Sequence, residues 1–181
     1  CRLSMNVNPS TLGYVIKDLI DSLAAHGIHK LVIVNSHGGN EFKPLLRELN
    51  GQTPVKIFLC DWFRGITADV QKEIFEDAGD HAGEMETALG LAYFNDFVLK
   101  NDDGSIAADE GAVNATRFDG INNGWVSITR DWHLLTTNTG SGNPHPATAE
   151  KGEQLMKVIV ERLSNFLVEL AESTIDERFP F

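Results

Sequence analysis

The sequence predicts an α/β fold in which helices pack on a mostly parallel sheet. Lys30–Asn35 and Pro54–Cys60 are short, nearly continuous apolar runs, the pattern of strands that are buried on both faces of a parallel sheet. Segments with the apolar spacing of helices precede, separate and follow these two runs. The order helix, strand, helix, strand is typical of layered α/β proteins.

The first part of the chain carries clear signals for the ends of its helices. Asn8-Pro9 marks the start of one helix, and apolar residues then recur at spacings of three and four as far as Gly27. A second helix is expected from Asn40 to Asn50, where Gly51 closes it. One predicted helix therefore precedes the first strand and the other connects the two strands.

The rest of the chain is more polar and richer in turns. We expect a mostly helical stretch over 67–77 and a helix from about Gly83 to Phe94. Residues 101–124 favour turns, and 125–129 predict a short strand. A last helix is expected over 147–173, and its apolar stripe is better suited to packing on a sheet than to binding a membrane because its other face carries charges of both signs.

Composition points to a globular protein and excludes two classes of partner. The 181 residues are 42% hydrophobic and 23% charged, so we expect one domain with a sizeable core over 1–181. The 15 basic and 26 acidic residues give a net charge of −11, which repels nucleic acids and anionic membranes. Without a leader pattern or a run of about 18 apolar residues, a cytoplasmic protein is expected.

Cysteine contributes little to the expected chemistry. Cys1 and Cys60 are the only two cysteines, which is too few for a disulfide framework. Cys60 ends the apolar run that forms the second predicted strand, so we expect an inert core thiol rather than a nucleophile.

The turn His37-Gly38-Gly39-Asn40 directly follows the first predicted strand. Ligands of open α/β sheets gather at the carboxyl ends of strands, and the two glycines let the backbone approach whatever His37 contacts. A neutral imidazole is a good ligand for Zn, Mn or Fe, and Asn40 could cap the next helix or bind a substrate. Alternatively, His37 only satisfies backbone groups of the turn, and a phosphate-binding loop is a further option. Asp61, after the second strand, is a candidate by position alone.

A second motif, His81-Ala82-Gly83-Glu84-Met85-Glu86-Thr87, opens the helix expected from Gly83. His81 and Glu84 are three residues apart and can approach one another, whereas Glu84 and Glu86 point to different sides of a helix. One glutamate could bind a metal, while the other holds a metal-binding residue in position by a hydrogen bond. The alternative is an ordinary helix start, with acidic residues favoured by the helix dipole.

Together the two motifs, in this order and at this spacing, resemble the signatures of the creatininase family of metal-dependent amidohydrolases. Residues 26–30, 142–144 and 147–152 are similar to further segments of that family. The resemblance implies a three-layer α/β/α fold with a mostly parallel central sheet. It also implies one or two divalent ions (Zn, Mn or Fe), hydrolysis of C–N bonds in cyclic amides, formamides or small peptides, and a homo-oligomer.

Carried over motif by motif, the resemblance implies a role for each polar residue. His37 and Glu84 would be metal ligands, and His81 would transfer a proton or contact the substrate. Glu86 would be a catalytic residue that supports the site from behind the metal ligands. Gly38, Gly39 and Asn40 would contact the substrate. Some family members have a carboxylate residue in place of the second glycine of this turn, and that carboxylate binds metal. This chain has Gly39 at that position, so Glu84 would have to supply the carboxylate ligand.

One part of the family pattern has no counterpart in this sequence. Family members carry an N-terminal Glu-x-His pair and a following Asp that bind metal, and nothing before Leu12 matches these residues. We therefore expect a creatininase-like domain without its N-terminal portion. The alternative to an active amidohydrolase is a non-catalytic subunit of the same fold with an incomplete metal site.

Overall fold

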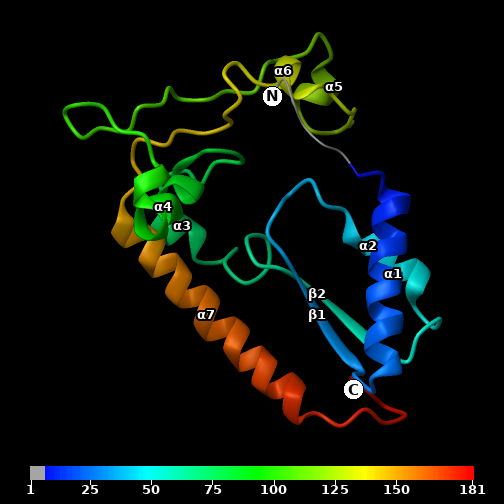
Figure 1. Cartoon of the computed structure of the whole chain (residues 1–181). Helices are drawn as coiled ribbons and strands as arrows, with labels where there is room; N and C mark the ends of the chain where they lie inside the picture. Colours follow the sequence, from blue (N-terminus) through cyan, green and yellow to red (C-terminus); the bar gives the residue numbers. More distant parts are fainter. Residues whose placement is uncertain (1–6) are drawn as a thin grey trace. The chain divides into compact units, whose positions relative to one another are not determined.

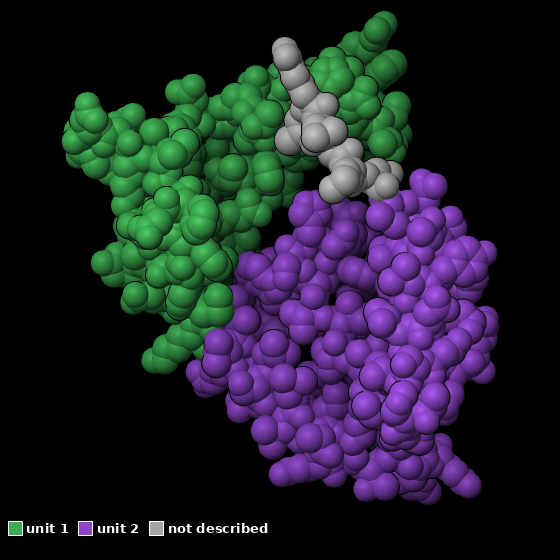
Figure 2. Space-filling view, in the orientation of Figure 1, with its two compact units in different colours: residues 1–3, 69–158 green, residues 4–68, 159–181 purple. Residues whose placement is uncertain are grey.

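The computed structural model describes residues 7–181, and they fall into two compact units. Residues 7–68 and 159–181 form the first, called here the sheet unit, and residues 69–158 form the second, called the α4 unit. Figure 2 shows the two units in different colours.

The sheet unit contains the two predicted strands and the two helices predicted around them. Helix α1 spans Pro9–Ala25, strand β1 Lys30–Asn35, helix α2 Phe42–Leu49 and strand β2 Lys56–Asp61. The strands pair in parallel, with Lys30 opposite Lys56 at one end and Asn35 opposite Asp61 at the other (Figure 1). The helix–strand–helix–strand order expected from the sequence is confirmed, and both carboxyl strand ends lie at one edge of the sheet.

Alternate residues of the strands face two different layers, as the two-residue period of a strand requires. Leu31 and Ile57 pack against the core of α1 and α2, which is formed by Ile16, Ile20, Leu49 and Val55. On the next register pair, the Phe58 ring meets Phe166 edge to face, with centroids 5.7 Å apart, and meets Phe179 at 6.2 Å. The sheet is therefore covered by helices on one side and by the C-terminal segment on the other.

Burial of the strands is less complete than the sequence predicts. The residues of β1 and β2 are mostly half-buried, and Val34 is 48% exposed. The reason is that the sheet described within residues 7–181 has only two strands, so each strand has one edge without a neighbouring strand.

Helix α7, Ala149–Glu172, has its first ten residues in the α4 unit and the rest in the sheet unit. At its C-terminal end, the Lys30 ammonium donates to the carbonyls of Leu170, Ala171 and Ser173. These carbonyls lack partners within the helix, so a cation is favoured there. The contact fixes the end of α7 to the start of β1.

The α4 unit consists of short helices joined by long loops. Its helices are α3 (Gln71–Ile74), α4 (Glu84–Tyr93), the 3-10 helix η1 (Asn95–Phe97), α5 (Asp119–Asn122) and α6 (Trp132–Leu135). Single bridges, including His81 to Ser141 and Gly111 to Gly142, hold the loops together. The first turns of α7 pack directly on α4, where Ala88 and Leu155 are fully buried.

Two sequence predictions for the α4 unit are wrong. Residues 125–129 form no strand, because they have no partner strand and leave Trp125 79% exposed. The helix expected over 67–77 shrinks to the single turn of α3, and turns occupy the residues before it. The helix expected from Gly83 to Phe94 is confirmed as α4.

Within residues 7–181, no helix is both long enough and apolar enough to cross a lipid bilayer.

Gly152 provides a test of the packing between α7 and α4. A Cβ at this position would lie 2.2 Å from the Ala88 carbonyl oxygen, so Gly152→Ala must push the helices apart. We expect a loss of about 1–3 kcal/mol in the free energy of unfolding, measured by urea denaturation. Gly120→Ala in α5 is the matched control, because its Cβ would lie 3.6 Å from Val126 at ordinary contact distance. Equal effects of the two variants would contradict this packing.

Candidate functional site

The turn after β1 is organised by the side chain of Asn35, which is 3% exposed. Its Oδ1 accepts hydrogen bonds from the His37 backbone N–H (3.2 Å) and from Asn40 Nδ2 (3.0 Å). Its Nδ2 donates to the His37 carbonyl (3.1 Å) and to the Asp61 carboxylate at the end of β2. The four polar residues thus form one network at the carboxyl edge of the sheet, where ligands of α/β folds bind.

His37 itself is exposed, and the glycines make room for its ring. The Gly39 N–H donates to His37 Nδ1 at 3.0 Å, which places the proton of the neutral imidazole on Nε2. A Cβ on Gly39 would lie 3.0 Å from His37 Cε1, and one on Gly38 would lie 3.1 Å from the Arg64 guanidinium. Side chains at either position would crowd the turn.

A cavity of about 490 Å³ opens beside this turn within the sheet unit. Asn40, Asp61 and Arg64 line the part nearest the turn, and α2 contributes Lys43 and Arg47. The Arg64 guanidinium lies 3.4 Å from the Gly38 carbonyl. Amide, carboxylate and guanidinium groups around one cavity can hold a small polar molecule by hydrogen bonds.

Cys60 precedes Asp61 in β2 and is half-buried. Burial raises the pKa of its thiol, and the neighbouring Asp61 carboxylate raises it further. Because a raised pKa keeps the thiol protonated at neutral pH, Cys60 is a poor nucleophile and a poor metal ligand there. These features agree with the expectation of an inert cysteine.

In the α4 unit, His81 lies beside Glu86 at the start of α4. Glu86 Oε2 is 3.7 Å from His81 Nδ1 and accepts a hydrogen bond of 2.7 Å from the Ala82 N–H. Ala82 adopts a φ of 51°, a left-handed conformation that turns the chain into the helix. The His81 ring also meets the Trp132 ring edge to face at 5.2 Å. Glu86 and Trp132 therefore restrain a histidine that is still 45% exposed.

The surroundings of Glu84 differ from those predicted by its three-residue spacing from His81. Its side chain is fully buried, forms an ion pair with Lys151 of α7, and accepts the N–H groups of Glu76 (2.9 Å) and Asp77 (3.2 Å). The expected approach of His81 to Glu84 is replaced by the approach of His81 to Glu86. Lys151 lies 67 residues from Glu84 in the chain, so no local spacing could reveal this partner.

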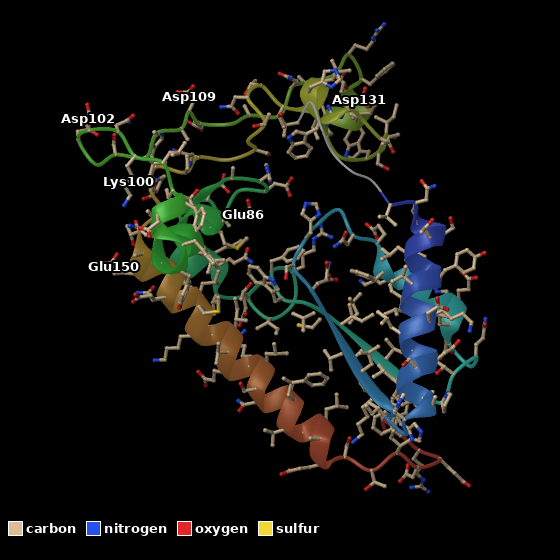
Figure 3. The ribbon with its side chains drawn as sticks, viewed as in Figure 1. Glu86, Lys100, Asp102, Asp109, Asp131 and Glu150 are labelled. Atoms are coloured by element: carbon tan, nitrogen blue, oxygen red, sulfur yellow. The ribbon has the colours of Figure 1, made fainter. Side chains whose placement is uncertain are left out.

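Glu86, labelled on α4 in Figure 3, also borders a cavity of about 350 Å³ in the α4 unit. The rest of its lining is largely apolar, formed by residues such as Val98, Leu99, Ile106 and Pro144. A mostly apolar cavity with one ionisable group at its edge is a usual place for a small organic ligand.

The donors present fit a metal only in part. Within residues 7–181 no three His, Cys, Asp or Glu side chains are grouped to hold a metal ion. His37 offers an exposed imidazole whose Nδ1 accepts from the Gly39 N–H, and Asn35 connects the His37 backbone to the Asp61 carboxylate. Glu84 offers no free carboxylate, because Lys151 and two backbone N–H groups already engage it. A metal at Glu84 would have to displace the Lys151 ammonium.

Comparisons with known proteins point to one family. The creatininase family model, described as creatinine amidohydrolase, matches residues 2–167. A protein of Bacteroides fragilis NCTC 9343 assigned as a creatinine amidohydrolase is 33% identical, with a TM-score of 0.83 over 96% of this chain and 66% of that one. A manganese form of creatininase is 22% identical, with a TM-score of 0.66 over 93% of this chain and 67% of its own. A search of curated protein sequences found no match.

A creatininase mutant complexed with creatine gives the same identity and TM-score as the manganese form, over 94% of this chain and 68% of that one. This chain therefore spans about two thirds of the length of these solved structures. The two structures at 22% identity support the fold, while the family model covers most of the sequence.

Proposed function

This chain belongs to the creatininase family, and from that membership we propose that it hydrolyses C–N bonds of small amides with the help of a divalent metal. Cyclic amides, formamides and small peptides are the proposed substrates. The observation that carries the proposal is the pairing of His81 with Glu86 beside a cavity large enough for such a molecule.

The proposed role of His81 is to deliver a proton to the departing nitrogen. An amide nitrogen is a poor leaving group until it is protonated, and a positioned histidine is the side chain most often used for this step. Glu86 is proposed to orient the ring and to pair with it when it is charged, as its 3.7 Å distance from Nδ1 allows. The edge contact with Trp132 further limits rotation of the ring.

His37 and Glu84 are the proposed holders of one or two divalent ions of Zn, Mn or Fe. When bound, such an ion lowers the pKa of its water and polarises the amide carbonyl. Support for the assignment is stronger at His37, whose ring is exposed, than at Glu84, whose carboxylate is paired with Lys151. The manganese and zinc forms among the similar structures favour a divalent ion.

Gly38, Gly39 and Asn40 are proposed to contact the substrate. Without side chains, the glycines let a substrate approach the backbone of the turn. Asn40 and Arg64 line the cavity beside it. The Asn40 amide can both donate to and accept from a substrate amide, the match that a C–N hydrolase needs.

A second candidate is a non-catalytic subunit of the same fold. It is favoured by one observation, namely that the described part of the chain lacks a group of three metal-type donors. The two candidates differ in whether the purified chain turns over any amide.

His81→Ala tests the proposed proton transfer. We expect turnover of a panel containing creatinine, a formamide and a dipeptide to fall by roughly 10²- to 10⁴-fold, while bound metal stays unchanged. His133→Ala on α6 is the matched control, since this exposed histidine of the same unit is given no role. Unchanged turnover in His81→Ala would remove the proposed role, and lost metal would make His81 a ligand instead. No turnover by the unaltered chain would favour the non-catalytic candidate.

We also infer that the chain assembles into a homo-oligomer. Support comes from the large apolar side chains exposed over 118–134, which are Phe118, Trp125, Val126, Ile128 and Leu134. Exposed apolar side chains that form a contiguous patch are typical of a protein interface. Light scattering after size exclusion should give a multiple of 19.9 kDa, and a monodisperse species of 19.9 kDa would contradict the inference.

A further inference from the structure

We propose that Asn35 and Asp61 are a positioning pair that sets the conformation of the His37 turn and the tautomer of its ring. The proposal rests on the proposed function, in which His37 holds the metal. The sequence assigns no role to Asn35 and makes Asp61 a candidate only by its position.

The Asn35 amide uses its full hydrogen-bonding capacity. Its oxygen accepts two hydrogen bonds and its nitrogen donates two. One bond of each kind involves the His37 backbone, whose N–H donates to the oxygen and whose carbonyl accepts from the nitrogen. The remaining oxygen contact comes from Asn40, and the remaining N–H points to Asp61. Only a side chain that both donates and accepts can make this set, so neither an aspartate nor a leucine can replace it.

The register of the sheet brings the pair together. Asn35 and Asp61 are the last residues of β1 and β2 and lie opposite one another. The Asp61 carbonyl in turn accepts the N–H groups of Arg64 (3.1 Å) and Gly65 (2.7 Å). The pair therefore connects the turn that carries His37 to the turn that carries Arg64, and both turns contribute residues to the same cavity, Asn40 from one and Arg64 from the other.

The consequence for His37 follows from its backbone. Because Asn35 holds both the N–H and the carbonyl of His37, it fixes how the backbone enters the turn. The following Gly39 N–H then meets Nδ1 and sets the tautomer with the proton on Nε2. In this tautomer neither ring nitrogen has a free lone pair, so an ion can bind Nε2 only when the proton moves to Nδ1 and the Gly39 hydrogen bond breaks.

The test compares Asn35→Asp with the exchanged pair Asn35→Asp and Asp61→Asn. In the single variant two carboxylates face each other, so the pair is broken. In the double variant the new amide at position 61 can donate to the new carboxylate, so part of the pair is restored. Asn165→Asp, an exposed change of the same type on α7, is the matched control.

The first readout is the His37 imidazole in the metal-free protein, followed by ¹⁵N NMR and assigned with a His37→Gln variant. We expect the Nε2-protonated pattern in the unaltered chain and in Asn165→Asp, its loss in Asn35→Asp, and its partial return in the double variant. Manganese titration of the unaltered chain is a separate readout, which tests the proposed function and not the pair.

Two outcomes would overturn the positioning role. An unaltered His37 pattern in Asn35→Asp would show that the pair does not set the tautomer, and loss without recovery in the double variant would show a general packing effect. If Asn35→Asp does not fold, Asp61→Leu, which removes the acceptor without adding a charge, must disturb the same His37 signals or the proposal fails. Absence of manganese binding in the unaltered chain would instead refute the proposed function, and the metal-free spectra would still decide the positioning role.

Discussion

The buried amide of Asn35 joins the two strand ends on which the rest of the sheet unit's polar chemistry is built. Parallel pairing brings the carboxyl ends of β1 and β2 to one edge, and burial of Asn35 at that edge requires every one of its polar atoms to find a partner. The partners are His37, Asn40 and Asp61, and the last two line the cavity beside the turn. Fold and site are therefore connected through one side chain.

In the α4 unit, a buried ion pair connects two helices, as Asn35 connects two strand ends in the sheet unit. Glu84 is fully buried, and its charge is balanced by Lys151 and by two backbone N–H groups. Removing one partner of a buried pair leaves an uncompensated charge, which is strongly destabilising. The pair joins the first turns of α4 and α7 and leaves Glu86, two residues further on, to face His81. Neighbouring glutamates on one helix thus have different surroundings.

Local signals in the sequence predict most helices and strands, but they do not predict which polar side chains pair with one another. Lys30–Asn35 is predicted with the observed boundaries of β1, because a short apolar run between turn residues has one simple interpretation. Trp125–Thr129 has the composition of a strand but no neighbour with which to pair, so β propensity alone misleads there. The histidine turns are visible as motifs, whereas Asn35–Asp61 and Glu84–Lys151 join residues 26 and 67 positions apart and emerge only from tertiary packing.

His37, held at the end of β1, is proposed to bind the metal of an amidohydrolase. The most direct test is the metal content of the full chain by elemental analysis after mild chelator washing, beside that of His37→Ala. We expect about one or two ions per unaltered chain and a clear loss of metal in His37→Ala. Equal metal in both proteins, or none in the unaltered chain, would contradict it.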